Sequence, residues 1–242
     1  AFMAIGGVFF VVGGGFLSDI NWRFPFGIYF IGLVLLPFVI LFLKEKKIES
    51  TQEELSIDIG KNMLVVYFFA FIYMLLFFIL PTQIPFLLIE KFEASGKMAG
   101  TVIATAFFCN ALGAIAFSKL KKYLNFIAIY LIGITLMALG FSLVGVINHI
   151  YFFFITSPIL GFAGGIMMTN ATAWMLSKTS HEKRVKSSGY FTSAIFLGQF
   201  LSPIVFHPFL DFLEIQDFFL YIGLSLFFVS FISFSILKIK QK

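Results

Sequence analysis

The chain has 242 residues, of which 60% are hydrophobic and 12% are charged, and 37 of them are phenylalanine. Soluble domains carry about 25% charged residues, so this composition excludes a water-soluble globular protein. The formal net charge of +5 stems from short loops beside apolar runs, where it meets anionic lipid rather than nucleic acid. The composition therefore predicts an integral membrane protein.

About 20 apolar residues are needed to cross the hydrocarbon core as a helix. The first predicted span, residues 1–17, is short, and because it has no initiator methionine we expect it to be cut from a longer chain. The second covers about residues 24–43. Residues 44–61 are the only long hydrophilic stretch and are predicted to be a cytoplasmic connector.

The third span, residues 62–89, is over-long and carries Pro81 and Pro85 in its last third, which predicts a kink there. Five more spans follow, over residues 99–118, 124–146, 151–176, 188–206 and 218–237. These runs are about twice as long as barrel strands and lack their alternation. We therefore predict an all-α, polytopic transmembrane bundle of eight spans.

Threading these spans through a bilayer puts 14 of the 17 lysines and arginines on one face and only Arg23, Lys91 and Lys97 on the other. The positive-inside rule predicts that the richer face is cytoplasmic. This places the connector and the C-terminus in the cytoplasm, and we expect a bacterial inner membrane.

Ionisable groups are predicted only in loops and at span ends, which includes all twelve acidic residues. An ionisable group inside a span usually marks an ion or proton pathway, so we expect a proton-coupling carboxylate, if used, to lie outside this segment. One cysteine and three histidines without ligand spacing give no metal site. No cofactor and no enzymatic activity are expected.

Neutral polar residues remain inside the spans, and three of them are predicted near mid-depth: Tyr73, Asn110 and Gln199. An amide in hydrocarbon costs a few kcal/mol without a partner, so Asn110 and Gln199 should face the protein interior. They either hydrogen-bond between helices or line a substrate pathway. The spacing of Gly189, Ser193, Phe196, Gln199 and Pro203 suits a cavity wall.

Gly161 and Gly165 lie in a run of small residues at every fourth position, a spacing that favours close helix packing over ligand contact. Asn170 is four residues before Trp174, and either meets a substrate or anchors the helix near the interface. Gln83 stands between Pro81 and Pro85, where a broken helix either lines a cavity or simply bends. Tyr73, Gln83, Asn110, Asn170 and Gln199 are therefore the predicted substrate-binding residues.

Several motifs resemble those of the major facilitator superfamily. Gly13-Gly14-Gly15 followed by Trp22-Arg23 resembles the passage from the fifth to the sixth helix of that family. Gly161-x-x-Gly164-Gly165 resembles the glycine-rich tenth helix, and the segment from Phe196 to Pro203 is similar to the eleventh helix of bacterial drug-efflux members. One departure is Phe9-Phe10, where drug antiporters usually carry Gly-Pro.

The resemblance implies that the chain is helices five to twelve of a twelve-helix secondary transporter, with the first four helices absent. Residues 1–43 would close the N-terminal half, and residues 62–242 would form the C-terminal six-helix half. The implied function is efflux of amphipathic small molecules by alternating access, with a proton as a candidate coupling ion. Uptake of a metabolite by symport, or a non-transporting sensor or structural subunit, is the alternative.

Overall fold

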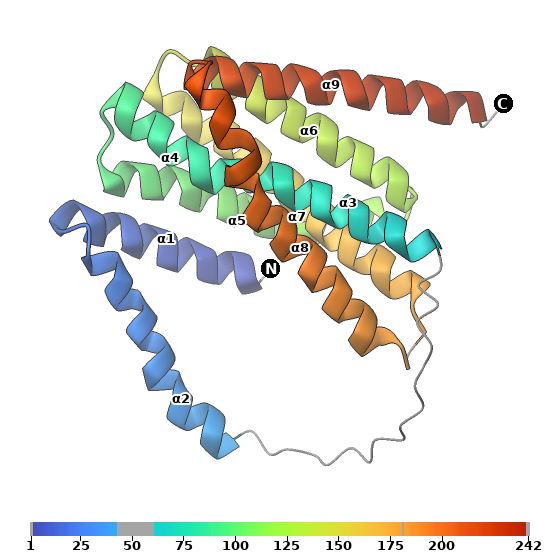
Figure 1. The fold of residues 1–242 in the computed structure, drawn as a ribbon, viewed down its shortest axis with the longest axis horizontal. Helices are drawn as coiled ribbons and strands as arrows, with labels where there is room; N and C mark the ends of the chain where they lie inside the picture. Colours follow the sequence, from blue (N-terminus) through green and yellow to red (C-terminus); the bar gives the residue numbers. More distant parts are fainter. Residues whose placement is uncertain (1, 43–60, 181, 241–242) are drawn as a thin grey trace.

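The computed structural model describes residues 2–42, 61–180 and 182–240, and every element in them is a helix (Figure 1). The α-helices are α1 (Phe2–Ile20), α2 (Ile31–Phe42), α3 (Lys61–Phe77), α4 (Ile79–Phe92), α5 (Gly96–Leu120), α6 (Phe126–Val146), α7 (Phe153–Lys178), α8 (Arg184–Phe206) and α9 (Ile215–Lys240). Short 3-10 helices are η1 (Phe24–Phe30), η2 (Ile150–Phe152) and η3 (His207–Asp211).

Seven described segments are long and apolar enough to cross a membrane, and Ile5–Ile20 is a shorter apolar helix. This confirms the predicted all-α membrane bundle, in which the first span was expected to be short. The connector predicted over residues 44–61 lies outside the described residues, except for Lys61, with which α3 begins.

The helix is interrupted at Phe78, between α3 and α4, three residues before Pro81, and the predicted kink stays a prediction. Pro81 has no N–H to donate to the carbonyl of Phe77, and its ring crowds that carbonyl. The hydroxyl of Thr82 donates to the carbonyl of Phe78 at 2.7 Å, and the N–H of Thr82 donates to the same oxygen at 3.3 Å.

Polar side chains cap the N-termini of α5 and α6, and α5 begins earlier than its hydrophobic run. The side chain of Ser95 accepts from the N–H of Met98 at 3.2 Å, so α5 begins at Gly96 instead of residue 99. Asn125 accepts from the N–H of Ala128 at 2.8 Å at the start of α6. Side-chain caps of this kind satisfy the free N–H groups of the first helical turn.

Successive spans run in opposite directions, so the loops gather at two ends of the bundle (Figure 1). One, here called the acidic end, carries these carboxylates: Asp19, Glu90, Glu93, Asp211, Glu214 and Asp217. The other, the basic end, carries these cations: Lys119, Lys121, Lys122, Lys178, Lys183, Arg184 and Lys186. The most extensive helix contacts are between α5 and α7, between α6 and α9, and between α1 and α5.

The hydrophobic core lies between α3, α4, α5, α6 and α7, where Tyr73, Phe141 and Phe153 are almost fully buried. In contrast, α2 has no buried residue, and it lies apart from the bundle in Figure 1. The packed part of the structure is therefore made of α3 to α9 and of α1, which packs on α5.

Candidate functional site

The backbones of α5 and α7 approach each other at glycines. A Cβ atom on Gly161 would overlap the carbonyl oxygen of Ala106, and one on Gly165 would overlap that of Asn110. Gly113 of α5 is crowded in the same way by the backbone of α7. Small residues at such contacts let helices associate through backbone packing, so these glycines set the distance between α5 and α7.

Tyr73 lies in the core of the bundle and is only 1% exposed. Its ring stacks on Phe77 with the ring centres 5.6 Å apart, and Phe77 occupies the space that a side chain at Gly164 of α7 would need. A substrate would reach Tyr73 only after these neighbours move. Its role in substrate binding stays a prediction.

Asn110 and Gln199 lie half-buried on two different helices. The backbone of Asn110 faces Gly165 at the contact between α5 and α7. Gln199 follows Gly198, at which an added Cβ would overlap the carbonyl of Phe71 in α3. Both amides therefore sit beside glycine contacts, and their convergence on one central space stays a prediction.

Asn170 is fully buried and joins α7 to the start of α6. Its Nδ2 donates to the carbonyl of Phe126 at 3.0 Å, and its Oδ1 has no partner in the described part of the chain. Trp174 stacks on the ring of Phe126, with centres 5.8 Å apart and planes 5° apart. This arrangement fits the anchoring alternative, and a substrate contact at Asn170 stays a prediction.

A cavity of about 660 Å³ lies at the acidic end, between α4, α8, η3 and the start of α9. It brings together two predicted site residues, Gln83 of α4 and Pro203 of α8. The proline-interrupted segment thus borders a cavity, which was one of its two predicted alternatives. Glu90 and Asp211 add carboxylates to the same wall.

The contact between α1 and α5 was not predicted. The carboxylate of Asp19 accepts from the backbone N–H groups of Gly96 at 2.6 Å and Lys97 at 3.0 Å. A Cβ on Gly15 would lie 2.6 Å from the carbonyl oxygen of Gly96 and 3.2 Å from the Cα of Gly100. The four-residue spacing of Gly96 and Gly100 is the signal that could have revealed this contact.

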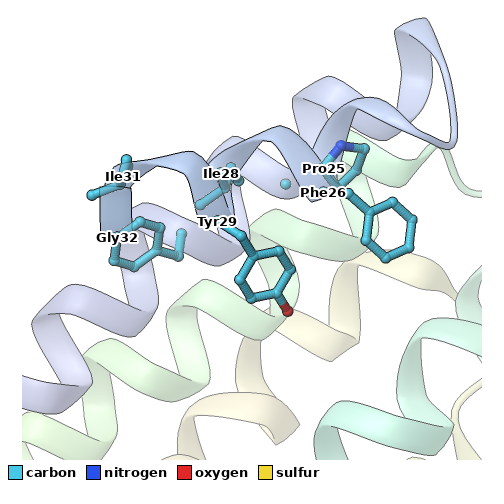
Figure 2. Close-up of a pocket in the computed structure, with 8 residues that line it drawn as sticks. Pro25, Phe26, Ile28, Tyr29, Ile31 and Gly32 are labelled. Carbon is cyan, nitrogen blue, oxygen red and sulfur yellow. The ribbon is translucent and has the colours of Figure 1, made fainter. Parts of the chain in front are cut away.

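The other residues of the glycine motif lie differently. A Cβ on Gly13 or Gly14 would have no atom within 4 Å, and Gly14 lines a cavity of about 510 Å³ between α1, η1 and α2. Figure 2 shows Phe26 and Tyr29 projecting from the same side of η1 at this cavity. Trp22 is exposed, and the guanidinium carbon of Arg23 lies 4.8 Å from the centre of its ring.

The chemistry of the described helices is that of neutral amides, hydroxyls and aromatic rings. Within the described residues, no three His, Cys, Asp or Glu side chains lie close enough together to hold a metal ion. The acids and bases of the described residues lie at the two ends of the bundle.

Seven segments of membrane-spanning length among the described residues, most of them packed through glycine contacts, define a multi-pass membrane protein. The family model of the Major Facilitator Superfamily matches residues 66–242. The chain therefore belongs to the Major Facilitator Superfamily, and it is part of a secondary transporter of small molecules. A search of curated proteins gave no match.

Proposed function

We propose that the chain supplies helices five to twelve of a twelve-helix transporter that exports amphipathic small molecules by alternating access. In this proposal α1 and α2 end the N-terminal half, and residues 62–242 form the complete C-terminal half. The bacterial inner membrane, with the basic end in the cytoplasm, is part of the same proposal and follows from the distribution of lysines.

The observation that carries the export of amphipathic compounds is the exposed face of α8. Ser193, Phe196 and Phe200 are exposed, Gln199 is half-buried beside them, and no charged residue occurs in α8 after Lys186. Aromatic surface with one amide and one hydroxyl suits a solute that is mainly apolar and has few polar groups. A sugar phosphate or an organic acid would need a buried cation, which this face does not offer.

The contact between α1 and α5 supports alternating access. In the proposed division it joins the N-terminal half to the C-terminal half at the acidic end, through Asp19 and Gly15. Because the contact rests on exposed hydrogen bonds and backbone packing, it is suited to break and re-form. A conformation closed at the acidic end would then alternate with one closed at the basic end.

The same fold is compatible with metabolite uptake by symport and with a non-transporting sensor or structural subunit. Uptake would require the driving ion and the solute to move together toward the basic end. A sensor would bind solute without net movement. For a proton-driven exporter, we propose that the coupling carboxylate lies outside residues 1–242.

The proposal is tested with the complete reading frame in everted membrane vesicles, by following energised accumulation of a lipophilic fluorescent dye. Phe196→Ala and Gln199→Leu should each slow accumulation severalfold, because both alter the neutral face of α8. Phe231→Ala is the matched control, since Phe231 is an exposed aromatic residue of α9. Accumulation only in vesicles of the opposite orientation would favour uptake, and equal rates in all three variants would overturn the assignment of this face.

A further inference from the structure

We propose that the cavity at the acidic end binds an organic cation with an apolar body, at a site separate from the neutral face of α8. The cavity measures about 660 Å³, which lies in the range of sites for drug-sized ligands, about 300–1,000 Å³. Its walls come from α4, α8, η3 and the start of α9, elements that are distant in sequence.

Gln83 is the first observation that points to a ligand. It is 4% exposed and lines the cavity, and no hydrogen bond joins its amide to another described residue. The amide of Gln83 opens onto the cavity, so a bound molecule or water in the cavity can pair with it. Thr82 beside it donates its hydroxyl proton to Phe78, which leaves the oxygen of Thr82 free to accept.

The charge of the walls is the second observation. Glu90 and Asp211 both line the cavity. The nearest lysine in sequence, Lys91, is engaged by Glu214, with Nζ and Oε2 3.7 Å apart. His207 is the remaining ionisable residue of the wall. Two carboxylates at the mouth of a low-dielectric cavity attract a cation more strongly than the same groups would in bulk water.

The rest of the lining distinguishes an organic cation from a metal ion. Phe86, Pro203 and Leu210 line the cavity with apolar atoms. Within the part of the chain that the structure describes, the acids and the histidine do not form a metal-binding group. A ring of Phe86 beside a carboxylate suits a quaternary cation, which gains both apolar contact and cation–π attraction.

Binding is measured with the complete protein in lipid nanodiscs, using radiolabelled tetraphenylphosphonium, with uncharged triphenylphosphine oxide as the neutral probe. The double variant Glu90→Gln/Asp211→Asn should bind the cation about tenfold more weakly, a change of about 1.4 kcal/mol, and the neutral probe unchanged. Asp217→Asn is the matched control, because Asp217 is an exposed acid near the cavity that does not line it. His207→Gln should leave cation binding intact or strengthen it.

The position of the bound cation is tested by protection of a single thiol in a Cys109→Ala background. Tetraphenylphosphonium should slow alkylation of the Phe86→Cys variant, since Phe86 lines the cavity and is 57% exposed. The Tyr151→Cys variant, at the same end and 67% exposed, should react at one rate with and without the probe. Equal protection of the two thiols by tetraphenylphosphonium would overturn the proposed site. So would equally tight binding of the cation by the parent protein and by the Glu90→Gln/Asp211→Asn variant.

If the double variant does not fold, the same binding measurement is made on Asp211→Asn alone. This variant should fold, because Asp211 is an exposed residue at the end of η3. Binding in nanodiscs requires no transport, so this result is independent of the proposed direction of export.

Discussion

Asp19, at the end of α1, caps the first turn of α5 at Gly96, 77 residues further along the chain. Its carboxylate accepts two backbone N–H groups that the helix itself leaves without partners. The negative charge also lies at the positive end of the α5 dipole, a contact that is favourable at exposed sites by about 0.3–1 kcal/mol. The contact between α1 and α5 therefore depends in part on the charge of Asp19.

Neutralising this carboxylate should loosen the acidic end. In Asp19→Asn we expect the population with α1 separated from α5 to rise about two- to fivefold, because the charge–dipole term is lost. Distances between spin labels at positions 20 and 151 measure this population. Glu93→Gln, an exposed acid at the same end, is the control, and an equal shift in both variants would contradict a specific role of Asp19.

The two adjacent glycines Gly14 and Gly15 should respond differently to alanine. Gly15→Ala puts a Cβ 2.6 Å from the carbonyl oxygen of Gly96, whereas Gly14→Ala meets no atom within 4 Å. The first should therefore push α1 from α5 even though Asp19 is intact, and the second should not. The same spin-label pair provides the measurement, and identical distance distributions in the two variants would show that the contact is not held at Gly15.

The contact between α5 and α7 should tolerate no side chain. We expect Gly161→Ala to destabilise the protein by about 1–3 kcal/mol, the usual cost of overpacking, because backbone cannot move aside as a side chain can. A loss of that size lowers the unfolding midpoint by roughly 2–4 °C per kcal/mol, which thermal unfolding in detergent would detect. Gly189→Ala, with no atom near the added Cβ, should unfold at or above the parent temperature.

The orientation in the membrane is tested with one thiol at each end. In a Cys109→Ala background, an impermeant reagent added to intact cells should label Tyr151→Cys at the acidic end but not Ser180→Cys at the basic end, because the lysines hold the basic end inside. Permeabilised cells should label both. Labelling of Ser180→Cys from outside would reverse the predicted topology.

Much of the fold follows from properties that a helix carries locally. The interruption at Phe78 follows from the missing N–H of Pro81, and the separation of charges follows from the cost of placing them in hydrocarbon. The helix starts were less well predicted. A hydrophobic run ends at the surface of the hydrocarbon core, whereas a helix such as α5 extends beyond it to a capping residue, here Ser95.

The site was less predictable, since it depends on which faces meet. Four-residue spacing singled out Gly161 and Gly165, but the choice of Gly13 and Gly14 over Gly15 in α1 could not be decided without the rotation of α1 on α5. The role of Asp19 could not be predicted either, because its hydrogen-bond partners, the N–H groups of Gly96 and Lys97, lie in a different helix. The amides of Asn110 and Gln199 are placed by the fold, and their role awaits a bound solute.

The two tryptophans of the chain lie at opposite ends of the bundle, and this gives the protein two built-in optical reporters. Trp22 is 68% exposed beside Arg23, whereas Trp174 is 8% exposed against Phe126. Their emission should differ in colour and in accessibility to a water-soluble quencher. With Trp22→Phe or Trp174→Phe, the fluorescence of the remaining indole would report changes at one end of the bundle at a time, without any attached label.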